Sequence, residues 1–200
     1  MVRSLLLFGI ASALLGGTAY AGPATAASMP TLTAIDGKTY QPLDVTNHKA
    51  AVLVFILQDC PICNGYAPLV RRLAARFGPA GVRFYIVHVD PSLSVADARK
   101  HASDYGYTLP VLIDRKHELV TALHVGVAPT SIVLGQDGAV KYEGRIDDQY
   151  AGIGKPRTVA TTHELQDAIA SVIDGKPVAV SKTRTIGCAV PDLPSKSDKP

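Results

Sequence analysis

The chain lacks several features that would point to particular protein classes. Its 200 residues contain no tryptophan and only three cysteines, which is too few for a scaffold held together by many disulfides. The formal net charge is only +3 and the basic residues are scattered, so no nucleic-acid-binding face is indicated. No internal repeat is present. These absences leave a globular protein with one well-buried core, because the chain is too short for two comfortable domains.

The N-terminal residues have the order of a secretory signal peptide. Arg3 precedes an apolar stretch at residues 5–15, and Ala19-Tyr20-Ala21 follows as an A-x-A cleavage motif. We predict a signal peptide at 1–21 with cleavage after Ala21, and a second candidate cleavage site near Ala26 or Ala27. The alternative is an uncleaved membrane anchor, but the apolar stretch is shorter than the about 20 residues of a transmembrane helix. The prediction is an exported protein of the periplasm or cell envelope, with no membrane span after cleavage.

The mature sequence is organised as a flexible lead-in at 22–30, one domain at 31–176 and an extended tail at 177–200 that is rich in proline, serine and lysine. Within the domain, short apolar runs typical of strands alternate with amphipathic helical patterns. The expected elements are strands at 51–57, 82–89 and 110–114, helices at 62–77, 95–105 and 117–125, strands at 131–134 and 139–143, and a helix at 162–173.

This order predicts an α/β sandwich with a mostly parallel central sheet and helices on both faces. Gln136-Asp137-Gly138 lies between the last two strands and is typical of a β-hairpin, which adds antiparallel pairing and makes the sheet mixed. Asp36-Gly37, between short β-prone pieces, predicts an N-terminal β extension. Thr162 is the expected N-cap of the last helix.

The main chemical motif is Cys60-Pro61-Ile62-Cys63, which follows the apolar run at 51–57 and opens a helical pattern. The thiolate is the reactive form of cysteine, and a helix N-terminus stabilises negative charge, so Cys60 is the expected nucleophile. Cys63 lies one turn further along and is expected to attack a mixed disulfide on Cys60. Pro61 suits the first helical position, which needs no N–H donor. The alternative is a structural disulfide or two inert buried thiols.

Two further segments complete a family resemblance. The strand–Cys60-Pro61-Ile62-Cys63–helix order, followed by Val127-Ala128-Pro129-Thr130 before a hairpin, resembles the thioredoxin fold. Within that fold, residues 60–68, residues 142–148 and Gly187-Cys188 resemble the exported redoxins related to TlpA, ResA and the alkyl hydroperoxide reductase/thiol-specific antioxidant proteins. The resemblance covers roughly residues 31 to 190.

The resemblance implies a thioredoxin-like three-layer sandwich and a thiol–disulfide oxidoreductase that acts on the thiols or disulfides of exported proteins. It also implies a cis bond between Ala128 and Pro129 that faces the cysteine pair. The backbone of Ala128 would then pair with an extended substrate segment. No cofactor is expected, and the sequence indicates no particular oligomeric state.

The chain departs from the general thioredoxin pattern beside the motif. Many thioredoxins carry a buried carboxylate six residues before the first cysteine, where this chain has Val54. Asp59, next to the nucleophile, is a candidate substitute, or else an exposed loop residue or a partner of the helix dipole. Pro61 and Ile62 are expected to support the site.

Cys188 is the third cysteine and has several interpretations. An odd cysteine in an exported protein is unusual enough to require one. It could form a disulfide with Cys60 or Cys63 in one state, tether the tail, or bind a partner.

Three other functions remain to be weighed. Cys60, Cys63 and His124 could bind copper, as in the related SCO proteins, although those separate their cysteines by three residues and this chain by two. A peroxiredoxin-like peroxidase would need proline and threonine or serine where Leu53 and Leu57 stand. A non-catalytic docking module predicts that replacing both motif cysteines with serine leaves biological activity intact.

Overall fold

The computed structural model describes residues 29–194. The predicted signal peptide, the lead-in up to residue 28 and the last six residues of the tail lie outside the described part. In chain order the elements are β1 (Leu32–Thr33), β2 (Thr39–Tyr40), β3 (Ala50–Ile56), α1 (Pro61–Phe77), a 3-10 turn (Gly78–Ala80), β4 (Val82–His88), α2 (Val95–Asp104), β5 (Val111–Ile113), α3 (Glu118–Ala122), β6 (Val127–Ala128), β7 (Thr130–Gly135), β8 (Val140–Gly144), β9 (Tyr150–Gly152), β10 (Lys155–Pro156), α4 (Glu164–Ile173) and β11 (Cys188–Ala189).

The central sheet has five strands in the order β5-β4-β3-β7-β8. Strands β3, β4 and β5 are parallel, whereas β7 is antiparallel to β3 and β8 is antiparallel to β7. The mixed sheet predicted from the sequence is therefore confirmed. Strand β3 lies at its centre and all seven of its residues are buried, as expected of a continuous apolar run that is covered on both faces.

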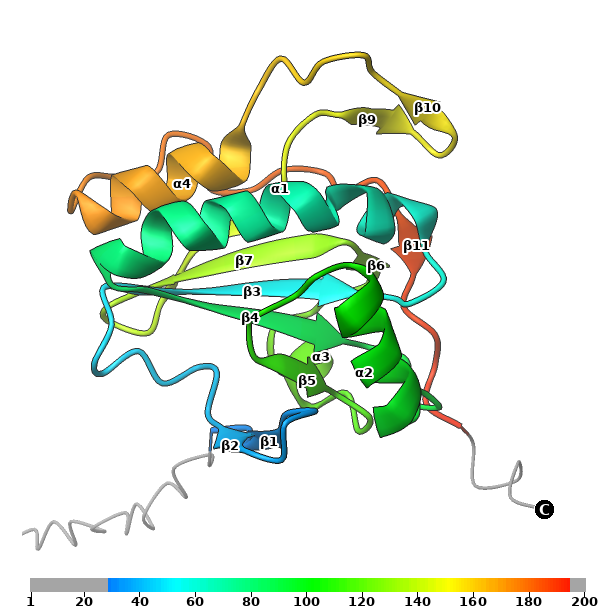
Figure 1. The fold of residues 1–200 in the computed structure, drawn as a ribbon. Coiled ribbons are helices and arrows are strands. Elements are labelled where there is room, and N and C mark those ends of the chain that lie inside the picture. Colours follow the sequence, from blue (N-terminus) through cyan, green and yellow to red (C-terminus); the bar gives the residue numbers. More distant parts are fainter. Residues whose placement is uncertain (1–28, 195–200) are drawn as a thin grey trace, which may run out of the picture.

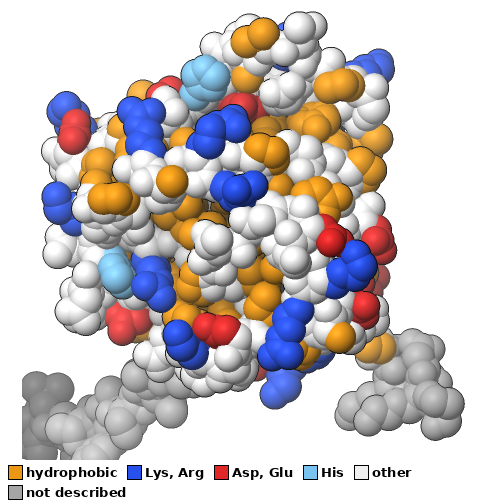
Figure 2. All heavy atoms as spheres, in the orientation of Figure 1, with side chains coloured by type: hydrophobic (Ala, Val, Ile, Leu, Met, Phe, Trp, Pro, Cys, Tyr) orange, Lys and Arg blue, Asp and Glu red, His pale blue; other side chains and the backbone are white. Residues whose placement is uncertain are grey.

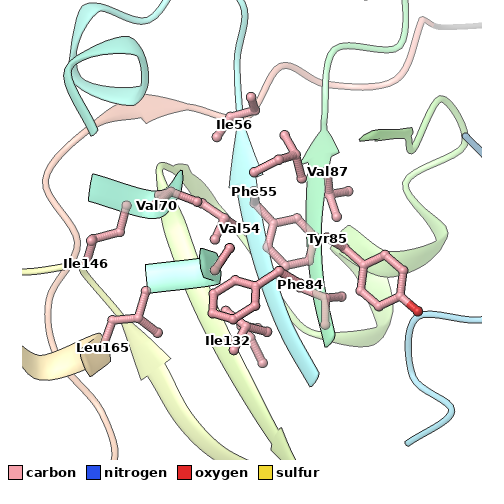
Figure 3. Close-up of a cluster of buried hydrophobic side chains, with 14 of the residues drawn as sticks. Val54, Phe55, Ile56, Val70, Phe84, Tyr85, Val87, Ile132, Ile146 and Leu165 are labelled. Carbon is pink, nitrogen blue, oxygen red and sulfur yellow. The ribbon is translucent and has the colours of Figure 1, made fainter. Parts of the chain in front are cut away.

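The helices cover the sheet and complete the three-layer sandwich. Helices α1 and α4 run along one face, and the short α3 lies behind the sheet in the view of Figure 1. Figure 3 shows part of the buried core, where Val70 of α1 lies beside Val54 of β3. Ile132 of β7 pairs with Leu53, the neighbour of Val54, and so belongs to the other face of the sheet. Among the described residues, no helix is both long and apolar enough to cross a membrane.

The N-terminal β extension is confirmed as the antiparallel pair β1 and β2. Its turn contains Gly37, whose φ of +86° lies in the left-handed region that glycine adopts easily. Just after β1, Ala34 forms an isolated bridge to Leu112 of β5. The extension is therefore fastened to one edge of the central sheet.

The prediction of Thr162 as a helix cap was wrong by one residue. His163 is the N-cap of α4 and its side chain makes no capping hydrogen bond. The hydroxyl of Thr162 instead donates to the carboxylate of Glu164 at 2.8 Å. The acceptor oxygen of this hydroxyl, which a cap would offer to a backbone N–H, lies 3.4 Å from a guanidinium N–H donor of Arg145.

Two segments that were not predicted as strands lie on the surface. Strands β9 and β10 form a two-stranded hairpin above α1, and β11 pairs with β6 near the N-terminal end of α1 (Figure 1). The tail was expected to be extended from residue 177, and its boundary with the domain stays a prediction. Residues 181–190 nevertheless lie against the sheet and are hydrogen-bonded to it.

Charged side chains are dispersed over the face drawn in Figure 2. Lysine and arginine side chains alternate there with acidic and uncharged ones and form no continuous basic stripe. This face offers no extended field that would favour a nucleic acid.

Candidate active site

Cys60 lies at the junction between β3 and α1. It is the N-cap of α1, with the extended backbone angles φ −87° and ψ 111°, and its carbonyl accepts the first helical hydrogen bond from Asn64 at 3.0 Å. Pro61 occupies the start of the helix, where a missing N–H leaves nothing unsatisfied. The unpaired N–H groups of this first turn provide the positive end of the helix dipole beside Cys60.

Ala128 and Pro129 face Cys60 from the loop that enters β7. The Ala128–Pro129 peptide bond is cis, and the sulfur of Cys60 lies 3.7 Å from the carbonyl oxygen of Ala128. This is a contact rather than a hydrogen bond here, because the sulfur is part of a disulfide and carries no proton. The structure thus brings together Cys60, Ala128 and Pro129, which the sequence places 68 residues apart.

Cys60 forms a disulfide with Cys188 in the tail. The two residues are separated by 128 positions and their Cα atoms are 6.3 Å apart, within the usual range for disulfides. Cys188 lies opposite Ala128 in the antiparallel pair of β11 and β6. Of the interpretations left open for Cys188, the structure contains the disulfide with Cys60.

Cys63 is a free thiol one turn into α1 and is only 1% exposed. Burial raises its pKa from 9.0 to about 12, because the thiolate loses its hydration there, and a backbone hydrogen bond at Leu57 only partly offsets this effect. Cys63 is therefore protonated at neutral pH. A protonated thiol is a poor nucleophile, so Cys63 is unreactive in this state.

The supporting residues predicted around the motif lie on different sides of it. Asp59 and Pro61 are exposed, whereas Ile62 is buried. Asn64 holds the loop before Cys60, since its amide donates to the carbonyl of Gln58 at 2.8 Å. The amide oxygen of Asn64 lies 2.9 Å from Nε2 of His101, which is in α2.

The segment Arg145–Asp148 contributed to the family resemblance, and its side chains brace the site. Arg145 pairs with Glu164 at the start of α4. Tyr66 of α1 donates a 2.7 Å hydrogen bond to the carboxylate of Asp147. Asp148 accepts hydrogen bonds from the loop before α4, and the hydroxyl of Thr161 and the backbone N–H groups of Thr161 and Thr162 lower its pKa. These residues fasten α1 and α4 to the end of β8.

His124 is exposed and its backbone is in the left-handed region, with φ 54°. Among residues 29–194, no three side chains of histidine, cysteine, aspartate or glutamate gather closely enough to hold a metal ion. Cys60, Cys63 and His124 belong to no such group in this arrangement, and the copper alternative stays a prediction.

Sequence reasoning missed the tail strand and its place beside β6. Gly187 is the signal that could have indicated it, because a Cβ atom there would collide with the carbonyl oxygen of Ala128 and lie 2.6 Å from its carbonyl carbon. A glycine directly before an unassigned cysteine is compatible with close packing of the two backbones.

Comparison with known proteins places the chain among redoxins. The model of the AhpC/TSA family matches residues 23–143. A protein named thiol-disulfide oxidoreductase ResA from Geobacillus kaustophilus is 34% identical over 83 residues, which are 41% of this chain and 46% of the relative. ResA from Geobacillus thermodenitrificans is 30% identical over 111 residues, 55% of this chain and 62% of the relative. The chain thus spans less than two thirds of either relative.

A solved structure agrees with the fold. The crystal structure of an uncharacterized conserved protein from Geobacillus kaustophilus matches with a TM-score of 0.74 and 27% identity, over 84% of this chain and 91% of that one.

Proposed function

Because the chain belongs to the AhpC/TSA family, we propose that it is an exported thiol–disulfide oxidoreductase whose Cys60 exchanges disulfides with other proteins. One observation carries the proposal. Cys60 is already engaged in a disulfide at a helix N-terminus, facing the cis bond before Pro129. The two ResA relatives, named as thiol-disulfide oxidoreductases, support the same chemistry.

The reaction starts from the reduced protein. The Cys60 thiolate, stabilised by the first turn of α1, attacks one sulfur of a partner disulfide, so that a mixed disulfide forms and one partner thiolate leaves. A second cysteine of this chain then attacks the sulfur of Cys60, and the second partner thiolate leaves. The partner has gained two electrons, and this chain ends with one disulfide. The same steps in reverse order oxidise a partner dithiol to a disulfide.

Cys188 and Cys63 are the two candidates for the second cysteine. Cys188 is the partner of Cys60 in the structure and is partly exposed. Cys63 is nearer in sequence, but its thiol is buried and its pKa is raised to about 12. We propose Cys188 as the principal resolving residue. Cys63 can act only after a rearrangement has exposed its thiol and a base has removed the proton.

The proposal includes no cofactor, since cysteine sulfurs and protons suffice for the exchange. The proposed partners are exported proteins with accessible thiols or disulfides. The proposed location is the periplasm or cell envelope, after signal cleavage behind Ala21. Intact-mass measurement of the protein recovered from the envelope tests the cleavage: a mass that begins at Met1 contradicts it.

Redox titration against glutathione tests the activity. The mature protein is equilibrated over a range of glutathione ratios, trapped with acid and alkylated, and its disulfides are mapped by mass spectrometry. We expect one two-electron transition in the wild type, assigned to Cys60–Cys188, with Cys63 alkylated only after unfolding. Failure of Cys60 to cycle at any ratio contradicts the oxidoreductase proposal. A Cys60–Cys63 link as the main product reassigns the resolving role.

A further inference from the structure

The tail is bound to the site in the manner expected of an extended peptide substrate. Cys188 pairs with Ala128 and Ala189 with Val127 in an antiparallel ladder, and the N–H of Val190 donates to the carbonyl of Gly126 at 3.1 Å. Strand addition of this kind is a general way to bind an extended peptide at an open sheet edge. In this structure the chain's own tail pairs in this way with the two-residue strand β6, whose free backbone edge it occupies.

The fit beside the cis bond requires a residue without a side chain. A Cβ atom on Gly187 would collide with the carbonyl oxygen of Ala128, and it would lie 2.6 Å from the carbonyl carbon of Ala128 and 3.0 Å from Cδ of Pro129. These obstacles are backbone and ring atoms that cannot rotate away. A segment that pairs with β6 and presents its cysteine to Cys60 therefore needs glycine immediately before that cysteine.

The part of the tail that precedes Gly187 is anchored separately. The N–H of Glu143 donates to Ser181 at 2.9 Å, and the N–H of Thr183 donates to Glu143 at 3.0 Å. The hydroxyl of Thr183 accepts from the N–H of Arg145 at 3.0 Å. None of these contacts depends on the disulfide, so they hold Cys188 near Cys60 at a high effective concentration after reduction.

We propose that the edge of β6 selects extended partner segments in which glycine precedes the reacting cysteine, and that residues 186–190 compete with the partner for this edge. The inference rests on the proposed function. The partner segment lies on β6 while its cysteine is bonded to Cys60. When the tail returns, it displaces the partner strand and brings Cys188 to Cys60. Disulfide resolution and partner release thus become a single event.

The bonds and electrons of that event balance. Before it, the sulfur of Cys60 is bonded to the partner's cysteine and Cys188 is a thiolate. The Cys188 sulfur attacks the sulfur of Cys60, the bond between Cys60 and the partner breaks, and the partner leaves as a thiolate that takes up a proton. The Cys60–Cys188 disulfide forms, and no oxidant or reductant beyond the partner disulfide is needed.

Peptide disulfides test the glycine requirement. The full mature chain carrying Cys63→Ser and Cys188→Ser has Cys60 as its only thiol. It is mixed with the hexapeptide Thr-Ile-Gly-Cys-Ala-Val, whose cysteine is capped as the 5-thio-2-nitrobenzoate disulfide. A matched peptide has valine in place of glycine. The rate is followed by release of the coloured thiol, and the capping reagent without peptide measures the intrinsic reactivity of Cys60.

We expect the glycine peptide to react at least about tenfold faster than the valine peptide, from the usual penalty for overpacking a tight contact. Equal rates for the two peptides overturn the strand-edge proposal and leave the oxidoreductase proposal intact. If the capping reagent itself fails to react with Cys60, the proposed function fails. Residual binding of the variant's own tail to β6 slows the reaction of both peptides equally, so the ratio of the two rates does not change.

Variants of the intact tail provide the second test. Gly187→Val places a side chain against Ala128, whereas Ala189→Val changes an exposed residue on the other side of Cys188. We expect the equilibrium constant for forming the Cys60–Cys188 disulfide against glutathione to fall by about tenfold or more in Gly187→Val. It should change little in Ala189→Val. Equal effects of the two substitutions, or a Cys60–Cys188 bond that joins two copies of the chain, contradict the proposal.

Discussion

Cys60 and Cys63 are nearly equally inaccessible, at 2% and 1% exposed, yet their surroundings differ in kind. Cys60 is covered by the tail strand and the loop of Ala128 and Pro129. Cys63 is covered by the helix that carries it and by the core. Reactivity therefore depends on whether the covering group can leave. A short surface strand can be displaced, whereas a core cannot be opened without unfolding.

The region around Cys63 is a buried set of weakly polar side chains. Burial raises the pKa of Tyr107, and proximity to Cys63 adds to this effect. The ring of Tyr107 lies 6.2 Å from that of His101, and the ring of His101 lies 5.0 Å from that of His88. His88 is fully buried and neither of its ring nitrogens has a hydrogen-bond partner within the described part of the chain. This environment favours neutral groups throughout.

The largest expected effect separates the two cysteines of the motif. Cys60→Ser should abolish disulfide exchange, because it removes the sulfur that bonds first to the partner protein and then to Cys188. Cys63→Ser should keep most of the exchange rate, since a thiol with a pKa of about 12 contributes little thiolate at neutral pH. The readout is reduction of a protein disulfide by the pre-reduced variants under anaerobic conditions. Equal losses in the two variants would remove the contrast between the cysteines.

The disulfide to the tail should contribute strongly to stability. Cys188→Ser opens a covalent loop whose ends are 128 positions apart and should lower the free energy of unfolding of the oxidised protein by about 3–5 kcal/mol. Urea unfolding followed by circular dichroism measures this difference. With dithiothreitol present, the wild type and the variant should converge. If their free energies of unfolding differ as much with the reductant as without it, the stabilisation comes from the side chain of Cys188 and not from the disulfide bond.

His88 should make the buried side sensitive to acid. Desolvation is the main cause and the charge of His101 the second, and together, against an opposing effect of Asp90, they lower the pKa of His88 from 6.5 to about 3. The folded state therefore favours neutral His88, so its stabilising effect is complete above pH 6.5 and is lost as the pH falls toward 3. His88→Leu should flatten the fall in unfolding free energy over that window, whereas the exposed His163→Gln should leave it unchanged. A wild-type slope in His88→Leu contradicts this assignment.

The smallest expected effect concerns the brace between α1 and the segment after β8. Tyr66→Phe removes the 2.7 Å hydrogen bond to Asp147 and should lower the free energy of unfolding by about 1–2 kcal/mol, because a buried carboxylate loses a donor. Tyr105→Phe is the control, since its hydroxyl makes no side-chain hydrogen bond among the described residues. Thermal unfolding at one pH compares the two. If Tyr66→Phe loses no more stability than Tyr105→Phe, the hydrogen bond to Asp147 does not contribute as expected.

Local patterns predicted the fold well where they were continuous. The apolar run that became β3, the helical periodicity that became α1 and the turn at Gly138 need only neighbouring residues to specify them. The hairpin of β9 and β10 was not predicted, since its residues are mostly exposed and have no apolar alternation. Its position depends on Tyr150, which packs against Tyr66 and Gly65 of α1.

The sequence alone determined that Cys60 lies where a helix stabilises a thiolate, because the strand, the cysteine and Pro61 are consecutive residues. Only the tertiary structure decided its partner. Cys63 is three residues away but is buried, where hydration of a thiolate is lost. Cys188 is 128 residues away but is delivered by a strand that pairs with Ala128. Spacing along the chain gives proximity, whereas burial and strand pairing decide which sulfur meets Cys60.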